Sequence, residues 1–149
     1  MKVIIVCDSA GFCLKAPIIN YFSDNKIEYY DGGSYDESSV DYTDYALLAA
    51  EAVRSGEYDR GILLCGTGIG MSIAANKVKG IRAAVCNDLF SAVATSAHNN
   101  TNVLCVGGRV VSPDTAVQIV DLWLNTAFEG GRHQRRIDKI TDIEAKYFT

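Results

Sequence analysis

Short apolar runs, rich in β-branched residues, alternate along the chain with longer segments whose apolar positions recur every three or four residues. The short runs predict buried strands and the longer segments predict helices. The predicted strands are Lys2–Cys7, Glu28–Tyr30, Gly61–Cys65, Ala83–Cys86 and Val103–Val106. The predicted helices are Leu14–Asp24, Asp44–Ser55, Met71–Val78, Leu89–His98 and Ser112–Asn125.

The order of these elements predicts an α/β fold. Strands and helices alternate regularly, and parallel strands need a crossover of this kind between them. We therefore expect a three-layer α/β/α Rossmann-like fold, with a five-stranded parallel sheet, fully buried strands and helices on both faces. Ligands of such sheets bind at the carboxyl ends of the strands.

The last stretch, residues 130–149, predicts a helical extension at the C-terminus. Ile137, Ile140, Ile143 and Tyr147 follow one another at helical intervals and form one apolar stripe. No predicted strand follows to return this helix to the sheet. The stripe packs either on a partner subunit, which we favour, or on its own domain. The length of 149 residues fits a single domain, residues 1–149.

Composition excludes several classes of protein. Apolar residues make up 48% of the chain and charged residues 21%, which is typical of a globular protein and not of a disordered one. The apolar runs Val3–Cys7 and Ile62–Cys65 are far shorter than the roughly 20 residues of a membrane span. The apolar run after Lys2 ends at Asp8, too early for a signal peptide. We therefore expect a cytoplasmic protein that does not enter a membrane.

Charge and cysteine usage restrict the partners further. The formal net charge of -4 argues against nucleic-acid binding, which needs a basic face. The cysteines are five in number and have no CxxC spacing, so we expect free thiols, with neither a disulfide framework nor a zinc site. Positive charge gathers in residues 132–139, where a small anion could bind.

The strongest local motif is Cys65-Gly66-Thr67-Gly68-Ile69-Gly70-Met71-Ser72, which leaves a predicted strand and enters a helix. Its glycines let the backbone approach a ligand and turn N–H groups toward it. The helix N-terminus favours a phosphate, a developing oxyanion or the Cys65 thiolate. The plainer interpretation is a tight turn after a buried cysteine, but such a turn rarely needs three glycines.

Nucleotide binding is a rival interpretation of this motif. The spacing is GxGxG, whereas dinucleotide-binding folds have GxGxxG after the first strand. Asp88 does lie about 20 residues further on, where a ribose-binding acid belongs. The first strand, however, is followed by Asp8, which would repel a pyrophosphate. The spacing and Asp8 weaken the nucleotide-binding interpretation without excluding it.

Two further groups carry candidate chemistry. His98 lies near a predicted helix C-terminus, where it is either a surface cap or a group that exchanges a proton with a substrate hydroxyl. Arg132 and Arg136 are four residues apart on the terminal helix, so they share one face and could bind a dianion together. A solvated basic face is the equally plain alternative.

Several motifs follow one another in order over nearly the whole chain. They are Cys7-Asp8 with Ala10-Gly11, Ser39-Val40-Asp41-Tyr42, the run from Gly61 to Lys77, His98-Asn99-Asn100, Gly107-Gly108-Arg109 and Glu129-Gly130-Gly131-Arg132-His133. Together they resemble the type B ribose-5-phosphate isomerase family, which also includes galactose-6-phosphate and allose-6-phosphate isomerases.

This resemblance implies an aldose-ketose isomerase of the pentose phosphate pathway. Its substrates would be ribose 5-phosphate and ribulose 5-phosphate, interconverted through a cis-enediolate without a metal or another cofactor. The resemblance also implies a homodimer with shared active sites, and it leaves open whether dimers pair into tetramers.

The resemblance also implies roles for individual residues. Cys65 would be the base that moves the proton between C1 and C2, Thr67 and the loop N–H groups would hold the enediolate oxygen, and His98 would open the furanose ring. The residues implied to bind substrate are Asp8, Ser9, Tyr42, Gly66, Gly68, Gly70, Asn99, Arg109, Arg132 and Arg136. The three arginines would clamp the phosphate, partly across the dimer.

One position departs from the family pattern. Ser9 stands where the family usually has histidine, which bears on substrate length and affinity. The galactose-6-phosphate members are two-chain enzymes that do not keep the cysteine and the histidine in each chain, whereas this chain has both Cys65 and His98. We therefore expect a pentose phosphate isomerase, with a hexose-6-phosphate isomerase as the near alternative. A non-catalytic module that binds sugar phosphates or nucleotides is the more distant one.

Overall fold

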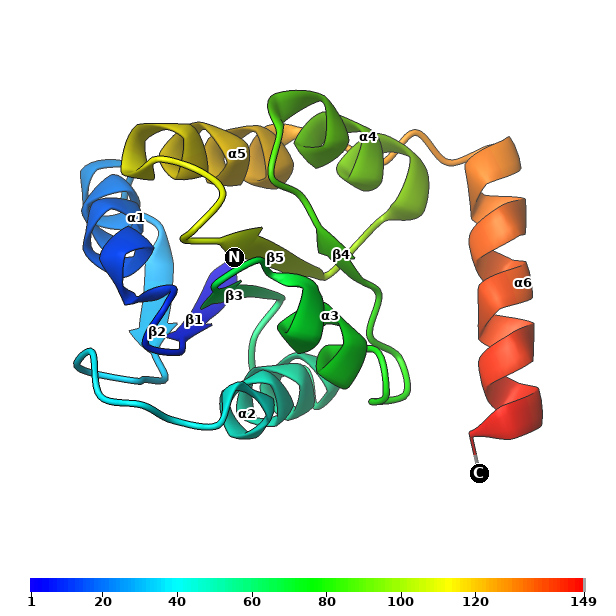
Figure 1. Cartoon of the computed structure of the whole chain (residues 1–149). Helices are drawn as coiled ribbons and strands as arrows, with labels where there is room; N and C mark the ends of the chain where they lie inside the picture. Colours follow the sequence, from blue (N-terminus) through cyan, green and yellow to red (C-terminus); the bar gives the residue numbers. More distant parts are fainter. Residues whose placement is uncertain (149) are drawn as a thin grey trace.

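The computed structural model describes residues 1–148. Strands and helices alternate as far as the fifth helix, and a sixth helix ends the chain (Figure 1). The strands are β1 (Lys2–Cys7), β2 (Glu28–Asp31), β3 (Arg60–Cys65), β4 (Ala83–Val85) and β5 (Val103–Gly107). The helices are α1 (Phe12–Asp24), α2 (Tyr42–Arg54), α3 (Ile69–Ala75), α4 (Leu89–Asn99), α5 (Pro113–Asn125) and α6 (Arg132–Tyr147).

The strands form one parallel sheet in the order β2-β1-β3-β5-β4, which confirms the predicted fold class. In the central register, Cys7 pairs with Leu64 and Cys65 pairs with Gly107, so β1, β3 and β5 end close to one edge. The expectation that all five strands are fully buried is wrong for β2 and β4. These two are the edge strands, and the β2 side chains Tyr29 and Tyr30 are 37% and 49% exposed.

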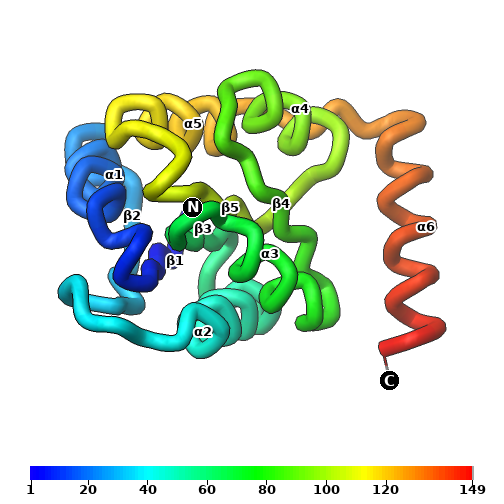
Figure 2. Tube along the Cα trace, in the orientation of Figure 1, coloured from blue at the N-terminus to red at the C-terminus, as the bar shows by residue number. Residues whose placement is uncertain are grey.

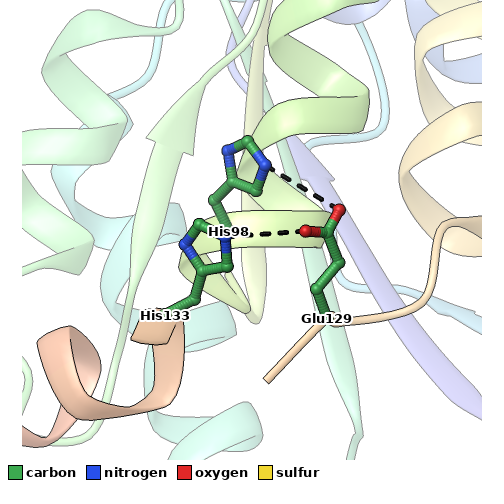
Figure 3. Close-up of side chains that lie close together, drawn as sticks. All are labelled: His98, Glu129 and His133. Atoms are coloured by element: carbon green, nitrogen blue, oxygen red, sulfur yellow. Dashed lines mark ion pairs between the residues drawn. The ribbon is translucent and has the colours of Figure 1, made fainter. Parts of the chain in front are cut away.

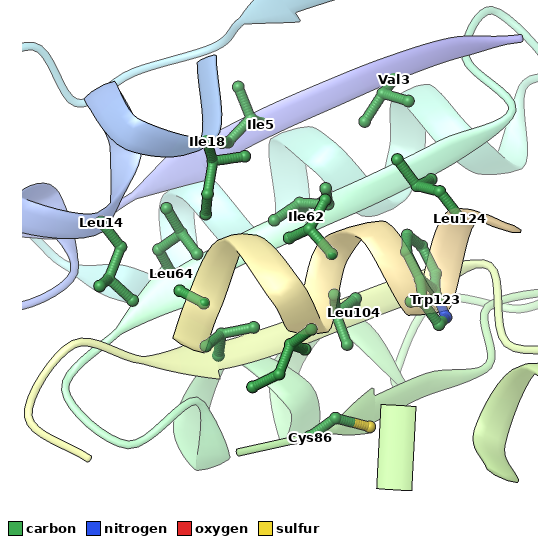
Figure 4. Close-up of a cluster of buried hydrophobic side chains, with 14 of the residues drawn as sticks. Val3, Ile5, Leu14, Ile18, Ile62, Leu64, Cys86, Leu104, Trp123 and Leu124 are labelled. Carbon is green, nitrogen blue, oxygen red and sulfur yellow. The ribbon is translucent and has the colours of Figure 1, made fainter. Parts of the chain in front are cut away.

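Each face of the sheet buries its own hydrophobic core. One core joins the sheet to α1, α4 and α5 and includes Leu14, Ile18 and Trp123 (Figure 4). The other joins the sheet to α2 and α3 and includes Met71. The Trp123 indole N–H is satisfied inside the first core, because it donates a hydrogen bond to Thr101 Oγ1 at 2.9 Å. Helices therefore cover both faces, as predicted.

Helix α6 runs at the margin of the domain, on the β4 side (Figures 1 and 2). Only the first residue of its apolar stripe, Ile137, is buried, whereas Ile140, Ile143 and Tyr147 are 46%, 59% and 68% exposed. A cavity of about 300 Å³ lies where Ile140 faces residues of the main domain. Most of the stripe is thus left uncovered by this chain. Over residues 1–148, no helix has both the length and the apolar character that crossing a membrane requires.

Candidate active site

The strand order reverses next to β1, which makes the carboxyl edge of the sheet at this point the expected position of a ligand. The chain leaves β1 toward α1 on one face and leaves β3 toward α3 on the other. Two loops that diverge in this way leave space between them, and ligands of open α/β sheets bind there. The backbone N–H of Asp8 donates to the Leu64 carbonyl at 3.0 Å, which fixes the two loops side by side.

Cys65 ends β3 at this edge of the sheet and is almost buried, at 5% exposure. The Gly68 N–H donates to Cys65 Sγ at 3.0 Å. This contact needs the left-handed backbone of Gly68, with φ +86°, which a residue with a side chain rarely adopts. Helix α3 begins directly after Gly68. The N–H groups of its first turn give this end of the helix a positive potential.

The other buried thiols are held in their neutral form. Burial raises the pKa of Cys7, raises that of Cys86 to about 11, and raises that of Cys105 well above the ordinary value. The neighbouring Cys65 raises the Cys105 pKa further. A thiol protonated at neutral pH is a poor base, so these three cysteines serve as apolar core residues.

The loop between Cys65 and α3 is held from two sides. Thr67 is exposed, and its hydroxyl accepts a hydrogen bond from the Ile69 N–H at 3.1 Å. Asn87, in the loop after β4, donates from Nδ2 to the Thr67 carbonyl at 2.9 Å and accepts from the Gly107 N–H at 2.8 Å. Asn87 thereby ties together the loops that follow β3, β4 and β5.

Three polar side chains border the same loop. Asp8 is half-buried, and its Oδ1 accepts from the Gly11 N–H at 3.0 Å. A Cβ built on Gly66 would lie 3.5 Å from Arg109 Nη1, so the guanidinium lies over the loop. A Cβ on Gly70 would lie 2.8 Å from two ring carbons of Tyr42, so that ring packs directly on the glycine backbone.

The remaining predicted residues lie at the opposite, amino edge of the sheet. Helix α4 runs back along the sheet, so its C-terminal residues His98 and Asn99 lie where the strands begin. Arg82, just before β4, confirms this placement by donating from Nε to the Asn100 carbonyl at 2.9 Å. The rise across β3 alone, at about 3.3 Å per residue, is about 16 Å. Cys65 and His98 of one chain therefore do not share a site.

His98 belongs instead to a cluster with Glu129 and His133 (Figure 3). The two imidazoles stack with their centroids 4.3 Å apart and their planes inclined by 12°. Glu129 faces both rings, at 3.8 Å from His98 Nε2 and 3.5 Å from His133 Nε2. Desolvation lowers the pKa of His133, and His98, Arg132 and Arg136 lower it further.

This cluster combines two imidazoles and a carboxylate, a donor set that can also bind metal ions. Its donor atoms lie within 4.8 Å of one another. Arg132 and Arg136, however, act on His133 as positive charges, and such surroundings oppose a bound cation. The same surroundings attract an anion.

Comparison with known proteins identifies the family. A family model described as Ribose/Galactose Isomerase matches residues 3–140. The chain belongs to this family. It is 48% identical over 145 residues to ribose-5-phosphate isomerase B of Escherichia coli K12, covering 97% of each chain.

Solved structures agree with this assignment. The structure of Clostridium thermocellum ribose-5-phosphate isomerase B matches with a TM-score of 0.96 and 51% identity over 99% of each chain. That of Mycoplasma genitalium ribose-5-phosphate isomerase B, which contains bound ribulose 5-phosphate, matches with a TM-score of 0.92 and 41% identity over 97% of each chain. The chain is therefore a sugar-phosphate isomerase.

Within one chain of this isomerase, the predicted site residues fall into two groups. The carboxyl-edge group comprises Asp8, Ser9, Tyr42, Cys65, Gly66, Thr67, Gly68, Gly70 and Arg109. The amino-edge group comprises His98, Asn99, Arg132 and Arg136. Sequence reasoning missed the contacts of Asn87 and the placing of Glu129 and His133 beside His98. The available signal for Glu129 and His133 was their four-residue spacing, at the point where the arginine-rich helix begins.

Proposed function

We propose that this isomerase interconverts ribose 5-phosphate and ribulose 5-phosphate through a cis-enediolate, with Cys65 as the base. The observation that carries the proposal is the hydrogen bond from the Gly68 N–H to Cys65 Sγ at the start of α3. It brings a candidate base, the Cys65 sulfur, next to the N–H donors of the glycine loop. Proton abstraction beside a carbonyl needs both.

The proton transfer follows from this arrangement. The Cys65 thiolate takes the proton from C2 of the open-chain aldose, and the electron pair of the C–H bond forms the enediolate, with negative charge on O1. Thr67 and the N–H groups of the glycine loop stabilise that oxygen, so no metal or cofactor is required. The thiol then returns the proton to C1, while the proton of the C2 hydroxyl is transferred to O1 and leaves a carbonyl at C2.

Ring opening precedes this step, because ribose 5-phosphate exists mostly as a furanose. We assign it to His98. The bond between C1 and the ring oxygen breaks, the ring oxygen gains a proton, and the C1 hydroxyl loses one. An imidazole can supply one of these protons and accept the other. Asp8, Ser9, Tyr42 and Asn99 would contact the sugar.

The phosphate would be bound by the arginines. Arg109 lies over the glycine loop, and Arg132 and Arg136 occupy the first two turns of α6. Guanidinium groups form charge-assisted hydrogen bonds with a dianion. Because the last two arginines lie at the amino edge, they would reach a substrate at Cys65 only from a second subunit.

A homodimer with composite sites follows from this separation. Each site would take the carboxyl-edge group of one subunit and the amino-edge group of its partner. Exposed apolar side chains on the flanking helices, including Ile73 on α3 and Phe90 on α4, at 58% and 82% exposure, suit such a contact. The uncovered stripe of α6 would pack on the partner as well. The reaction belongs to the pentose phosphate pathway of the cytoplasm.

The test is a coupled assay that compares kcat/KM for ribose 5-phosphate, allose 6-phosphate and galactose 6-phosphate after treatment with a chelator. The proposal predicts the highest kcat/KM for ribose 5-phosphate, unchanged by chelation. A preference for a hexose 6-phosphate would assign the chain to the hexose-6-phosphate isomerases of the family. Binding of sugar phosphates without turnover of any of the three would indicate a non-catalytic module.

A further inference from the structure

Two side chains with no role in the proposed mechanism, Glu129 and His133, surround His98. Glu129 lies in the connection between α5 and α6, and its backbone N–H donates to the Ala97 carbonyl at 3.0 Å. That bond anchors the connection to the last turn of α4, directly beside His98. His133 follows in the first turn of α6, where its backbone N–H donates to the Gly130 carbonyl at 3.1 Å. Three separate segments thus meet at one imidazole.

The packing of the two rings restricts the orientation of His98. His133 is nearly buried, with its side chain 9% exposed, whereas the His98 side chain is 46% exposed. The buried ring lies parallel to the exposed one at 4.3 Å. One face of His98 is therefore covered by a fixed surface, and its remaining surface is open to a ligand.

Charge distinguishes the two rings. Two imidazolium ions at this separation would repel each other, so the pair holds one proton more readily than two. The groups that face the pair are Arg132 and Arg136 from α6, which oppose protonation, and Glu129, which favours it. His133 is the more buried ring, and burial disfavours its charged form. The Glu129 carboxylate, 3.8 Å from His98 Nε2, is the acidic group that faces the exposed ring.

We propose that Glu129 and His133 are positioning residues for His98, Glu129 by holding a carboxylate beside its Nε2 and His133 by fixing the plane of its ring. This inference rests on the proposed role of His98 in ring opening. Neither residue touches the reacting atoms. Both act on the step before proton transfer, so their loss slows the conversion of a cyclic substrate and spares an open-chain one.

The experiment separates these two steps in Glu129→Gln and His133→Asn. Isomerisation of ribose 5-phosphate includes ring opening. Exchange of the C1 proton of ribulose 5-phosphate with deuterated solvent, followed by NMR, does not include ring opening. Ribulose 5-phosphate is an open chain, because the C5 oxygen that would close a five-membered ring onto C2 carries the phosphate. Asp138→Asn is the matched control, since it removes one negative charge from α6 at a side chain bound to Gln134.

Both variants should lower kcat for ribose 5-phosphate by about tenfold, less than the roughly 100-fold or more that a general acid or base itself contributes, because His98 is still present. Both should change deuterium exchange by less than about twofold. Asp138→Asn should change neither quantity.

Two other outcomes overturn the inference. Equal loss of isomerisation and exchange would assign Glu129 and His133 a general structural role. Values of kcat and of the exchange rate in both variants that match those of Asp138→Asn would remove Glu129 and His133 from the reaction. Glu129 is exposed, so its variant keeps the test valid even if His133→Asn fails to fold. A wild-type protein without activity on ribose 5-phosphate would instead refute the proposed function.

Discussion

Gly70→Ala tests whether the packing of Tyr42 on the glycine loop matters for catalysis. The new Cβ would lie 2.8 Å from Tyr42 Cε2 and Cζ and 3.1 Å from its hydroxyl oxygen. Ordinary carbon contacts begin at about 3.5 Å, so the ring must move by about 0.7 Å. Tyr42 is 41% exposed and free to move outward. The φ of Gly70 is not positive, so alanine fits the backbone there.

The expected result is a loss of activity without a loss of stability. A displacement of this size at a substrate contact should lower kcat/KM for ribose 5-phosphate by about 10- to 100-fold. The free energy of unfolding should change by less than about 1 kcal/mol, because the better helix propensity of alanine offsets the strain. Both quantities are accessible by coupled assay and urea unfolding.

A double-mutant cycle with Tyr42→Ala isolates the cause. If the displaced ring accounts for the loss, Gly70→Ala should change kcat/KM by less than about twofold in the Tyr42→Ala background. A loss of the same factor in both backgrounds would refute this reasoning and place the effect in the glycine loop itself.

Three further substitutions test other parts of the account. Cys65→Ala should abolish isomerisation and deuterium exchange while substrate still binds. If the variant kept more than about a tenth of wild-type kcat, the barrier would have risen by less than about 1.4 kcal/mol, and another group would be the base. Arg136→Ala should raise KM for ribose 5-phosphate by at least about tenfold; an equal loss toward unphosphorylated ribose would contradict a phosphate contact. Thr101→Val should cost about 1–3 kcal/mol by leaving the buried Trp123 N–H unpaired, whereas Thr101→Ser should retain stability in urea unfolding.

Periodicity is sufficient to predict the strands, the helices and the parallel sheet, because each is encoded in neighbouring residues. It does not distinguish edge strands from central ones. The Glu28–Asp31 segment is a short run with two tyrosines, and its exposure depends on a strand order that nothing local specifies. The partial exposure of β4 escapes prediction for the same reason. Burial of a strand is a property of its neighbours in the sheet.

The candidate site likewise has one part that the sequence predicts and one part that it does not. The loop from Cys65 to Gly70 is contiguous, so its glycines and its cysteine are enough to predict a thiol next to backbone N–H groups, and the Gly68 N–H does donate to the Cys65 sulfur. The cluster of His98, Glu129 and His133 joins segments distant in sequence, and no local pattern brings them together. The general topology does explain one placement: a helix that follows a parallel strand runs back along the sheet, so residues at its end lie at the amino edge.

The proposed division of the site between two subunits is tested most directly by comparing two purified heterodimers. One pairs a Cys65→Ala chain with an Arg136→Ala chain; the other pairs wild type with the Cys65→Ala/Arg136→Ala double variant. If sites are composite, the first heterodimer contains one intact site and should reach about half the kcat/KM of wild type, while the second should be nearly inactive. The reverse pattern, with activity only in the second heterodimer, would place Cys65 and Arg136 of the same chain in one site and contradict the account.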